Sequence, residues 1–202
     1  MIAAVFDTLA WALGLALCVP GWRLKPARGL VVVGVIAALL CLPLAGSSLI
    51  AALRGLFAGL SVSTLVVLVG LFGARAGWLN VAQRERWALA VLFGVVGAAF
   101  YPAALGATVI DPYAWGYDAA GLALAAGALG VLAWLAGMRL LGLALVLALP
   151  VWRLGLLESV NLWDYLIDVP LALAGLIALV VLAFRSAPGR ASADPLSLPG
   201  GH

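Results

Sequence analysis

Two short segments hold most of the side chains that could recognise a polar ligand. The first reads Asp-Pro-Tyr-Ala-Trp-Gly-Tyr-Asp over residues 111–118, and the second reads Glu-Ser-Val-Asn-Leu-Trp-Asp-Tyr-Leu-Ile-Asp over residues 158–168. Aromatic rings beside carboxylates suit sugars, polyols and cations, because stacking and cation–π contacts add to hydrogen bonds. The pattern predicts a binding site, with a plainer alternative in which these residues are helix caps and interfacial anchors.

Asp7 is the other residue of interest, since it lies inside an apolar run over residues 2–19. An ionisable group in such a run usually faces a charged partner or a watery cavity, unless it sits near enough to the run's end to reach water. The basic partner would be Arg54 or Arg153. Together with the two segments, this reasoning selects the following candidate binding residues: Asp7, Arg54, Asp111, Tyr113, Trp115, Arg153, Glu158, Asn161, Trp163, Asp164 and Asp168.

Several kinds of chemistry are excluded by the residues that the sequence lacks. The one lysine, Lys25, lies in a polar connection, where it cannot form a retinal Schiff base inside a late helix. The one histidine, His202, is the last residue, so haem sites, zinc sites and Ser–His catalysis have no ligand or base within the apolar runs. Cys18 and Cys41 are expected to be unbridged packing residues. We expect no catalytic residues, no metal and no cofactor.

The elements that must position the candidate residues are apolar helices. The chain has 202 residues, of which 66% are hydrophobic and 9% charged, and its mean hydropathy is +1.22. Soluble domains carry about a quarter charged residues, so this composition predicts an all-α polytopic membrane protein. Residues 1–185 would form one helical bundle and residues 186–202 a disordered cytoplasmic tail. Seven spans are predicted, with six as the alternative, at residues 2–19, 29–44, 55–72, 87–105, 119–136, 140–156 and 165–184.

The distribution of charge predicts the orientation of these spans. Basic residues concentrate in cytoplasmic connections of membrane proteins. The opposite connections hold two basic residues, Arg54 and Arg153, and most of the carboxylates. The amino terminus is therefore expected outside and the carboxyl terminus in the cytoplasm of a bacterial inner membrane. Nine of the eleven basic residues fall on the cytoplasmic side: Arg23, Lys25, Arg28, Arg75, Arg84, Arg86, Arg139, Arg185 and Arg190.

Small residues predict where the helices approach one another closely. Gly55 and Gly59 form a small-xxx-small pattern, and further pairs of glycines occur at residues 94 and 97 and at residues 127 and 130. Residues 47–54 are expected to form a short helix, interfacial or re-entrant, before the third span. No pair of spans broken by Gly or Pro marks a transport site near the middle of the bilayer.

Three functions are compatible with these features. The favoured one is a non-enzymatic accessory or scaffold subunit of the cell envelope, whose outer face carries the acidic, aromatic site. The alternative is a small transporter or channel for a cation, a polyol or a lipid-linked substrate, and the third is an enzyme that uses carboxylates of the outer loops. The expected partners are membrane lipid and either another membrane protein or a second copy of the chain. Nucleic acid is not expected, because the basic excess reports membrane orientation.

Overall fold

A computed structural model describes residues 2–20, 26–44 and 46–186, and this part of the chain consists of helices, the turns and loops that connect them, and one two-residue strand pairing. The all-α prediction is confirmed. The strands β1 (Pro43–Leu44) and β2 (Ser47–Ser48) pair antiparallel. The α-helices are α1 (Ile2–Cys18), α2 (Pro26–Cys41), α3 (Leu49–Phe57), α4 (Val62–Arg75), α5 (Gln83–Leu89), α6 (Val96–Pro102), α7 (Ala120–Leu135), α8 (Arg139–Arg153), α9 (Trp163–Leu166) and α10 (Val169–Ser186).

The helix that begins at α5 continues through two wider, π-helical stretches. These are η1 (Ala90–Val95) and η2 (Ala103–Ala107), and η3 (Tyr113–Gly116) is a separate 3₁₀ turn. Pro102 lies directly before η2, where its missing N–H removes one bond of the α-helical ladder. The whole rod from Gln83 to Ala107 has 25 residues, and α10 has 18. Within the described residues, these two helices are long and apolar enough to cross a membrane.

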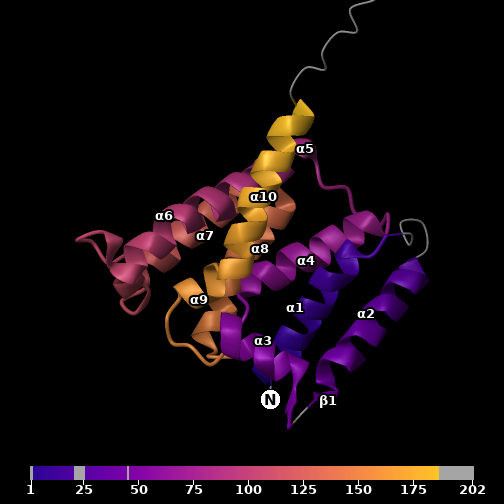
Figure 1. Cartoon of the computed structure of the whole chain (residues 1–202). Helices are drawn as coiled ribbons and strands as arrows, with labels where there is room; N and C mark the ends of the chain where they lie inside the picture. The colour runs from indigo at the N-terminus through magenta and orange to yellow at the C-terminus, as the bar shows by residue number, and fades with distance from the viewer. Residues whose placement is uncertain (1, 21–25, 45, 187–202) are drawn as a thin grey trace, which may run out of the picture.

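Helix α4 occupies the centre of the bundle. It packs against α1 on one side and against α8 on the other, and the further pairs are α1 with α2, α7 with α8, and α10 with η1. In Figure 1, the beginning of α1 lies at the lower end of the bundle with α3 and α9, whereas α5 and the carboxyl end of α10 lie at the upper end. The two ends are called the α3/α9 end and the α5 end below.

Two helices start later than the sequence pattern predicts. The third span was expected at residues 55–72, but α3 ends at Phe57 and α4 begins at Val62. The seventh was expected at residues 165–184, but α9 ends at Leu166 and α10 begins at Val169, with Ile167 extended between them. The apolar pattern did not indicate these two helix breaks, and the expectation that no broken pair marks a site near the middle of the bilayer stays a prediction. The expected tail at residues 187–202 lies outside the described residues, and Ser186 still belongs to α10.

The glycines that bring helices together are only partly those expected. A Cβ on Gly94 would lie 2.7 Å from the backbone of Gly175, so η1 and α10 touch through their main chains. Helices α7 and α8 meet similarly, because a Cβ on Gly142 would lie 2.8 Å from the carbonyl oxygen of Gly130. By contrast, nothing lies within 4 Å of a Cβ on Gly55, and Gly59 faces the carboxylate of Asp7. The predicted Gly55–Gly59 packing motif is wrong.

Charged side chains satisfy the start of α8 and the end of α1. The buried carboxylate of Glu85 accepts hydrogen bonds from the N–H groups of Leu140 (2.5 Å) and Leu141 (3.1 Å), in the first turn of α8. The guanidinium of Arg75 donates to carbonyl oxygens at the end of α1. The first N–H groups and last C=O groups of a helix lack partners within it, so these contacts join separate helices while satisfying both.

Replacing Glu85 with alanine should lower the free energy of unfolding by about 1 to 3 kcal/mol, because two buried N–H groups lose their acceptor. Glutamine at the same position keeps one amide oxygen that can accept, so Glu85→Gln should cost clearly less. Unfolding followed by helical circular dichroism in mixed detergent micelles measures both variants. Equal losses for the two would show that the capping hydrogen bonds do not stabilise α8.

Candidate functional site

The two helix breaks meet at one place, and Asp168 joins them. Its Oδ1 accepts from the N–H of Leu171 (2.7 Å), which caps the first turn of α10. Its Oδ2 accepts from the N–H of Ser61 (2.7 Å), where α4 begins, and from the hydroxyl of Thr64. Asp168 is only 6% exposed. One carboxylate therefore satisfies the starts of two helices that are 107 residues apart in sequence.

Asp7 binds the adjacent N–H group of the same helix start. Its Oδ1 accepts from the N–H of Leu60 (2.9 Å), and its Oδ2 forms an ion pair with Nε of Arg54 (2.8 Å). The side chain of Asp7 is 2% exposed. The positive end of the α4 dipole thus faces two buried carboxylates, those of Asp7 and Asp168. Of the two partners expected for Asp7, the structure selects Arg54.

Arg54 connects this buried pair to the surface. Its Nη2 donates to Oε1 of Glu158 at 2.7 Å. The Glu158 side chain is 75% exposed, against 26% for Arg54. The hydrogen bond and the positive charge of Arg54 lower the pKa of the Glu158 carboxyl below its ordinary value. The chain Asp7–Arg54–Glu158 therefore ties α1 and α3 to the segment that precedes α9.

A second polar group centres on Asp164 in α9. Its Oδ2 accepts from the hydroxyls of Tyr113 (3.0 Å) and Ser159 (2.5 Å). Partial burial and the nearby negative charge of Asp164 raise the pKa of the Tyr113 phenol, which therefore stays protonated and donating at neutral pH. Asn161 holds these segments in place, because its Nδ2 donates to the carbonyl of Tyr113 (2.9 Å) and its Oδ1 accepts from the N–H of Trp163 (2.9 Å).

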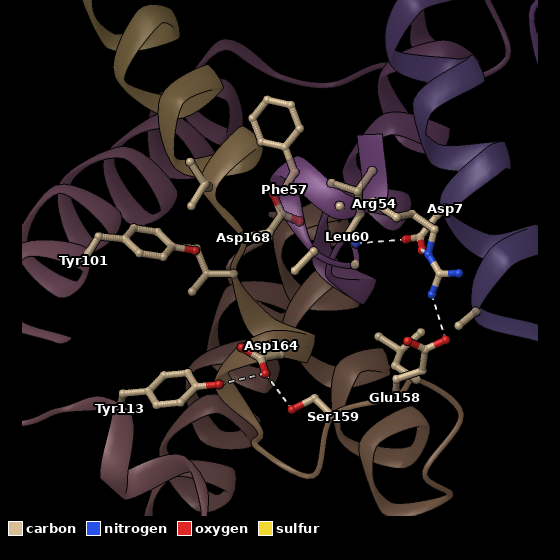
Figure 2. A pocket seen from close by; sticks show the side chains of 17 residues that line it. Asp7, Arg54, Phe57, Leu60, Tyr101, Tyr113, Glu158, Ser159, Asp164 and Asp168 are labelled. Atoms are coloured by element: carbon tan, nitrogen blue, oxygen red, sulfur yellow. Dashed lines mark hydrogen bonds and ion pairs between the residues drawn. The ribbon is translucent and has the colours of Figure 1, made fainter. Parts of the chain in front are cut away.

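Both groups line one cavity of about 670 Å³. Figure 2 shows Tyr101 and Tyr113 entering it from one side, with Asp7, Arg54 and Glu158 on the opposite side. The hydroxyl of Tyr101 points into the cavity and makes no hydrogen bond to any described residue. The size is that of an ordinary small-molecule site. Six of the eleven candidate residues line it: Asp7, Arg54, Tyr113, Glu158, Asp164 and Asp168.

The other five candidates lie outside the cavity. Asn161 and Trp163 support its wall, since Asn161 is fully buried and the indole N–H of Trp163 donates to the carbonyl of Pro112 (2.8 Å). Asp111 is exposed and caps its own turn by accepting from the N–H of Tyr113 (2.9 Å). Trp115 and Arg153 are exposed side chains that do not line it.

Three contributors were missed by the sequence analysis. Tyr101 carried no signal, because a single tyrosine in an apolar run is an ordinary feature of such helices. Ser159 lies between two selected residues, so its segment was found although its hydroxyl was not singled out. The N–H of Leu60 belongs to the backbone, and only the helix break exposes it to Asp7.

Ala58 adjoins the cavity in a conformation that favours glycine. It follows α3 with φ 57° and ψ −152°, where a Cβ costs roughly 1 to 3 kcal/mol. Ala58→Gly should therefore raise the free energy of unfolding by about 1 kcal/mol. The matched control is Ala51→Gly in the regular part of α3, which should instead lower it by about 1 kcal/mol. Detergent unfolding curves measure both variants. A lower free energy of unfolding for Ala58→Gly would show that the backbone of Ala58 is not strained.

The arrangement is suited to binding. Both oxygens of Asp7 and of Asp168 are occupied by helix N–H groups, hydroxyls or Arg54, so these carboxylates hold the breaks rather than face a ligand. Among the described residues, no three His, Cys, Asp or Glu side chains are grouped to hold a metal ion. The groups left to contact a ligand are Asp164, the outer oxygen of Glu158, and the hydroxyls of Tyr101, Tyr113 and Ser159.

Comparisons of the chain with family models, with curated proteins and with solved structures each give no match.

Proposed function

We propose that this chain is a non-enzymatic protein of the bacterial inner membrane that binds a small polar ligand at its outer face, as an accessory or scaffold subunit. Large apolar side chains on the outside of the bundle support the membrane part of the proposal. Leu105, Leu124, Leu135 and Phe184 are exposed among many others. Water would penalise so large an apolar surface, whereas lipid tails solvate it.

Seven helical segments support the proposed number of spans. They are α1, α2, α4, the rod from Gln83 to Ala107, α7, α8 and α10, with 14 to 25 residues each. At about 1.5 Å per residue, the 14 residues of α4 reach only about 21 Å, less than the hydrocarbon thickness of about 30 Å. In our proposal, α3 and the capped break before α4 complete that span, so the break lies inside the membrane where unpaired N–H groups are most costly.

The distribution of charge supports the proposed orientation. Arg84 lies in α5, Arg139 begins α8, whose first turn is bound by Glu85 of α5, and Arg185 lies in the last turn of α10, which ends at the α5 end. The α3/α9 end holds Asp7, Asp164 and the other carboxylates of the cavity. The positive-inside rule then assigns the α5 end to the cytoplasm and the cavity to the outer side.

The observation that carries the proposed role is the cavity itself. Its walls come from segments far apart in sequence, and its polar groups are held by hydrogen bonds within the wall rather than aligned as nucleophile and base. A pre-formed cavity with a few fixed polar groups is the usual form of a binding site. In this proposal the partners are membrane lipid and a further membrane protein or a second copy of the chain.

Cysteine labelling tests the orientation on which this role depends. With Cys18 and Cys41 replaced by serine, Ala114→Cys should react with a membrane-impermeant maleimide in intact spheroplasts. Ala82→Cys, at the exposed start of α5, should react only after permeabilisation. Labelling of both positions from the same side would refute the proposed topology. Labelling of neither before or after permeabilisation would show that these segments are not exposed loops, which also contradicts it.

The second candidate function is a transporter, and the two helix breaks favour it. Broken helices whose ends meet beside a cavity are a common feature of transport sites. Flux measurements separate the two functions. In our proposal, proteoliposomes take up labelled sodium or glycerol no faster than liposomes without protein. Faster uptake that Asp164→Asn abolishes, and that the loop variant Asp118→Asn leaves intact, would make the chain a transporter.

A further inference from the structure

We propose that the cavity binds a primary ammonium group, with Asp164 as its counter-ion. This inference rests on the proposed function, because it requires the cavity to be a ligand site, and it specifies the class of ligand. The ammonium could belong to a free small amine or to the ethanolamine headgroup of a lipid, since both present the same –NH₃⁺ group.

The balance of charge around the cavity leaves two carboxylates without a cation, Asp164 and Asp168, and of these only Asp164 has an oxygen that no described residue donates to. Four carboxylates line it, those of Asp7, Glu158, Asp164 and Asp168, against one guanidinium, that of Arg54. Arg54 is shared between Asp7 and Glu158. Asp168 is surrounded by N–H and O–H donors on both oxygens. Among the described residues, no basic side chain lies within ion-pair distance of Asp164.

The hydrogen bonds at Asp164 leave room for a ligand. Its Oδ2 accepts two hydroxyl hydrogens, from Tyr113 and Ser159, whereas its Oδ1 accepts from no described residue. Both of these donors are neutral hydroxyls, so they do not supply a counter-ion to the carboxylate. The group that completes this site should therefore carry positive charge and donate hydrogen bonds.

The neighbouring groups are mainly acceptors. The hydroxyls of Tyr113 and Ser159 already donate their hydrogens to Asp164, so their oxygens can only accept hydrogen bonds from a ligand. The Tyr101 hydroxyl points into the same space (Figure 2). A primary ammonium donates three hydrogen bonds, which matches Oδ1 of Asp164 and two of these oxygens. The faces of tyrosine rings also attract cations.

Other ligand classes fit less well. An anion would meet a surplus of carboxylates. A polyol needs donors as well as acceptors, and among the described lining side chains the free donors are the Tyr101 hydroxyl and the remaining N–H groups of Arg54. A quaternary ammonium has no N–H, so it would leave Oδ1 of Asp164 without a hydrogen bond.

Titration calorimetry of the purified full-length chain in detergent at pH 7 tests the free-amine source. The probe is ethanolamine, and its uncharged counterpart is ethylene glycol. Ethanolamine should bind more tightly than ethylene glycol, and Asp164→Asn should weaken it about 10- to 100-fold, the loss expected for a hydrogen bond to a charged group. Asp118→Asn is the matched control, because it removes an exposed carboxylate that does not line the cavity.

A second variant tests the ligand contact without the risk that Asp164→Asn weakens binding through a folding defect. Tyr101→Phe removes one proposed acceptor and breaks no hydrogen bond among the described residues, so the fold should be unaffected. It should weaken ethanolamine binding about 5-fold, as expected for one hydrogen bond. An unchanged affinity in Tyr101→Phe together with an unchanged affinity in Asp164→Asn would overturn the proposal.

Nanodiscs distinguish the lipid source. Phosphatidylethanolamine and phosphatidylcholine differ in whether the headgroup nitrogen carries hydrogens. A higher Tm in phosphatidylethanolamine that Asp164→Asn removes, without binding of free ethanolamine, identifies the headgroup as the ligand and supports the proposal. Binding of ethylene glycol as tight as that of ethanolamine, unaffected by Asp164→Asn, would overturn the ammonium assignment and leave the binding function intact. No binding of any probe and no lipid dependence would contradict both.

Discussion

Replacing Asp168 with alanine is expected to lower the free energy of unfolding by about 3 kcal/mol or more. The substitution leaves the N–H groups of Ser61 and Leu171 and the hydroxyl of Thr64 without their acceptor. Each buried donor that loses its partner costs about 1 to 3 kcal/mol. The starts of α4 and α10 would also lose the negative charge that faces their dipoles. Unfolding by detergent titration, followed by circular dichroism, measures the loss.

Two other variants separate the contributions to this loss. Thr64→Val removes a single hydrogen bond to Asp168 and should cost about 1 kcal/mol. Asp168→Asn keeps one acceptor oxygen and should fall between Thr64→Val and Asp168→Ala. If Asp168→Ala cost no more than Thr64→Val, the carboxylate would not be what joins the two helix breaks.

Replacing Gly175 with alanine is expected to be the most disruptive single-methyl change among the helix contacts. A Cβ at this position would lie 2.5 Å from the backbone nitrogen and 2.9 Å from Cα of Gly94. Backbone atoms cannot rotate away as a side chain can, so α10 and η1 must move apart. Overpacking of this kind costs about 1 to 3 kcal/mol and occasionally more. We expect a loss near 3 kcal/mol, measured by the same unfolding titration.

Gly34→Ala is the matched control for this variant. Gly34 also lies inside a helix, α2, but nothing stands within 4 Å of a Cβ built on it. The added methyl should raise stability by up to about 1 kcal/mol, because alanine favours helix over glycine. Gly94→Ala should resemble Gly175→Ala, since it creates the same contact from the other side. Equal stability of Gly175→Ala and Gly34→Ala would refute the close approach of α10 and η1.

Much of the secondary structure follows from the pattern of apolar residues. Runs of apolar residues bounded by Pro, Gly and charged residues predicted α1, α2, α7 and α8 to within a few residues. The same pattern placed polar residues in two segments, and it predicted for Asp7 either a basic partner or contact with water. Arg54 and Arg153 were equivalent by sequence, and only the position of α3 beside α1 selects Arg54.

The glycines show that sequence reasoning could not decide which helices pack against each other. Gly55 and Gly59 have the spacing of a helix-packing motif, yet the backbones of Gly94 and Gly175, 81 residues apart, are the ones that approach each other closely. Spacing within one helix says which residues share a face. It does not say which helix covers that face, and this depends on how all the helices pack together.

Sequence reasoning had the same limit for the residues that line the cavity. Their types and their two sequence segments could be read from the chain, because carboxylates and tyrosines stand out among apolar residues. The breaks that form the cavity depend on partners distant in sequence: Asp7 binds Leu60 across 53 residues, and Asp168 binds Ser61 across 107. A break leaves buried N–H groups that require acceptors. Local sequence supplies the hydroxyl of Ser61 for Thr64 and Oδ1 of Asp168 for Leu171, whereas the N–H groups of Leu60 and Ser61 depend on the distant carboxylates. The sequence therefore determined which polar groups the protein has, and the tertiary structure decided where two helices could break to bring them together.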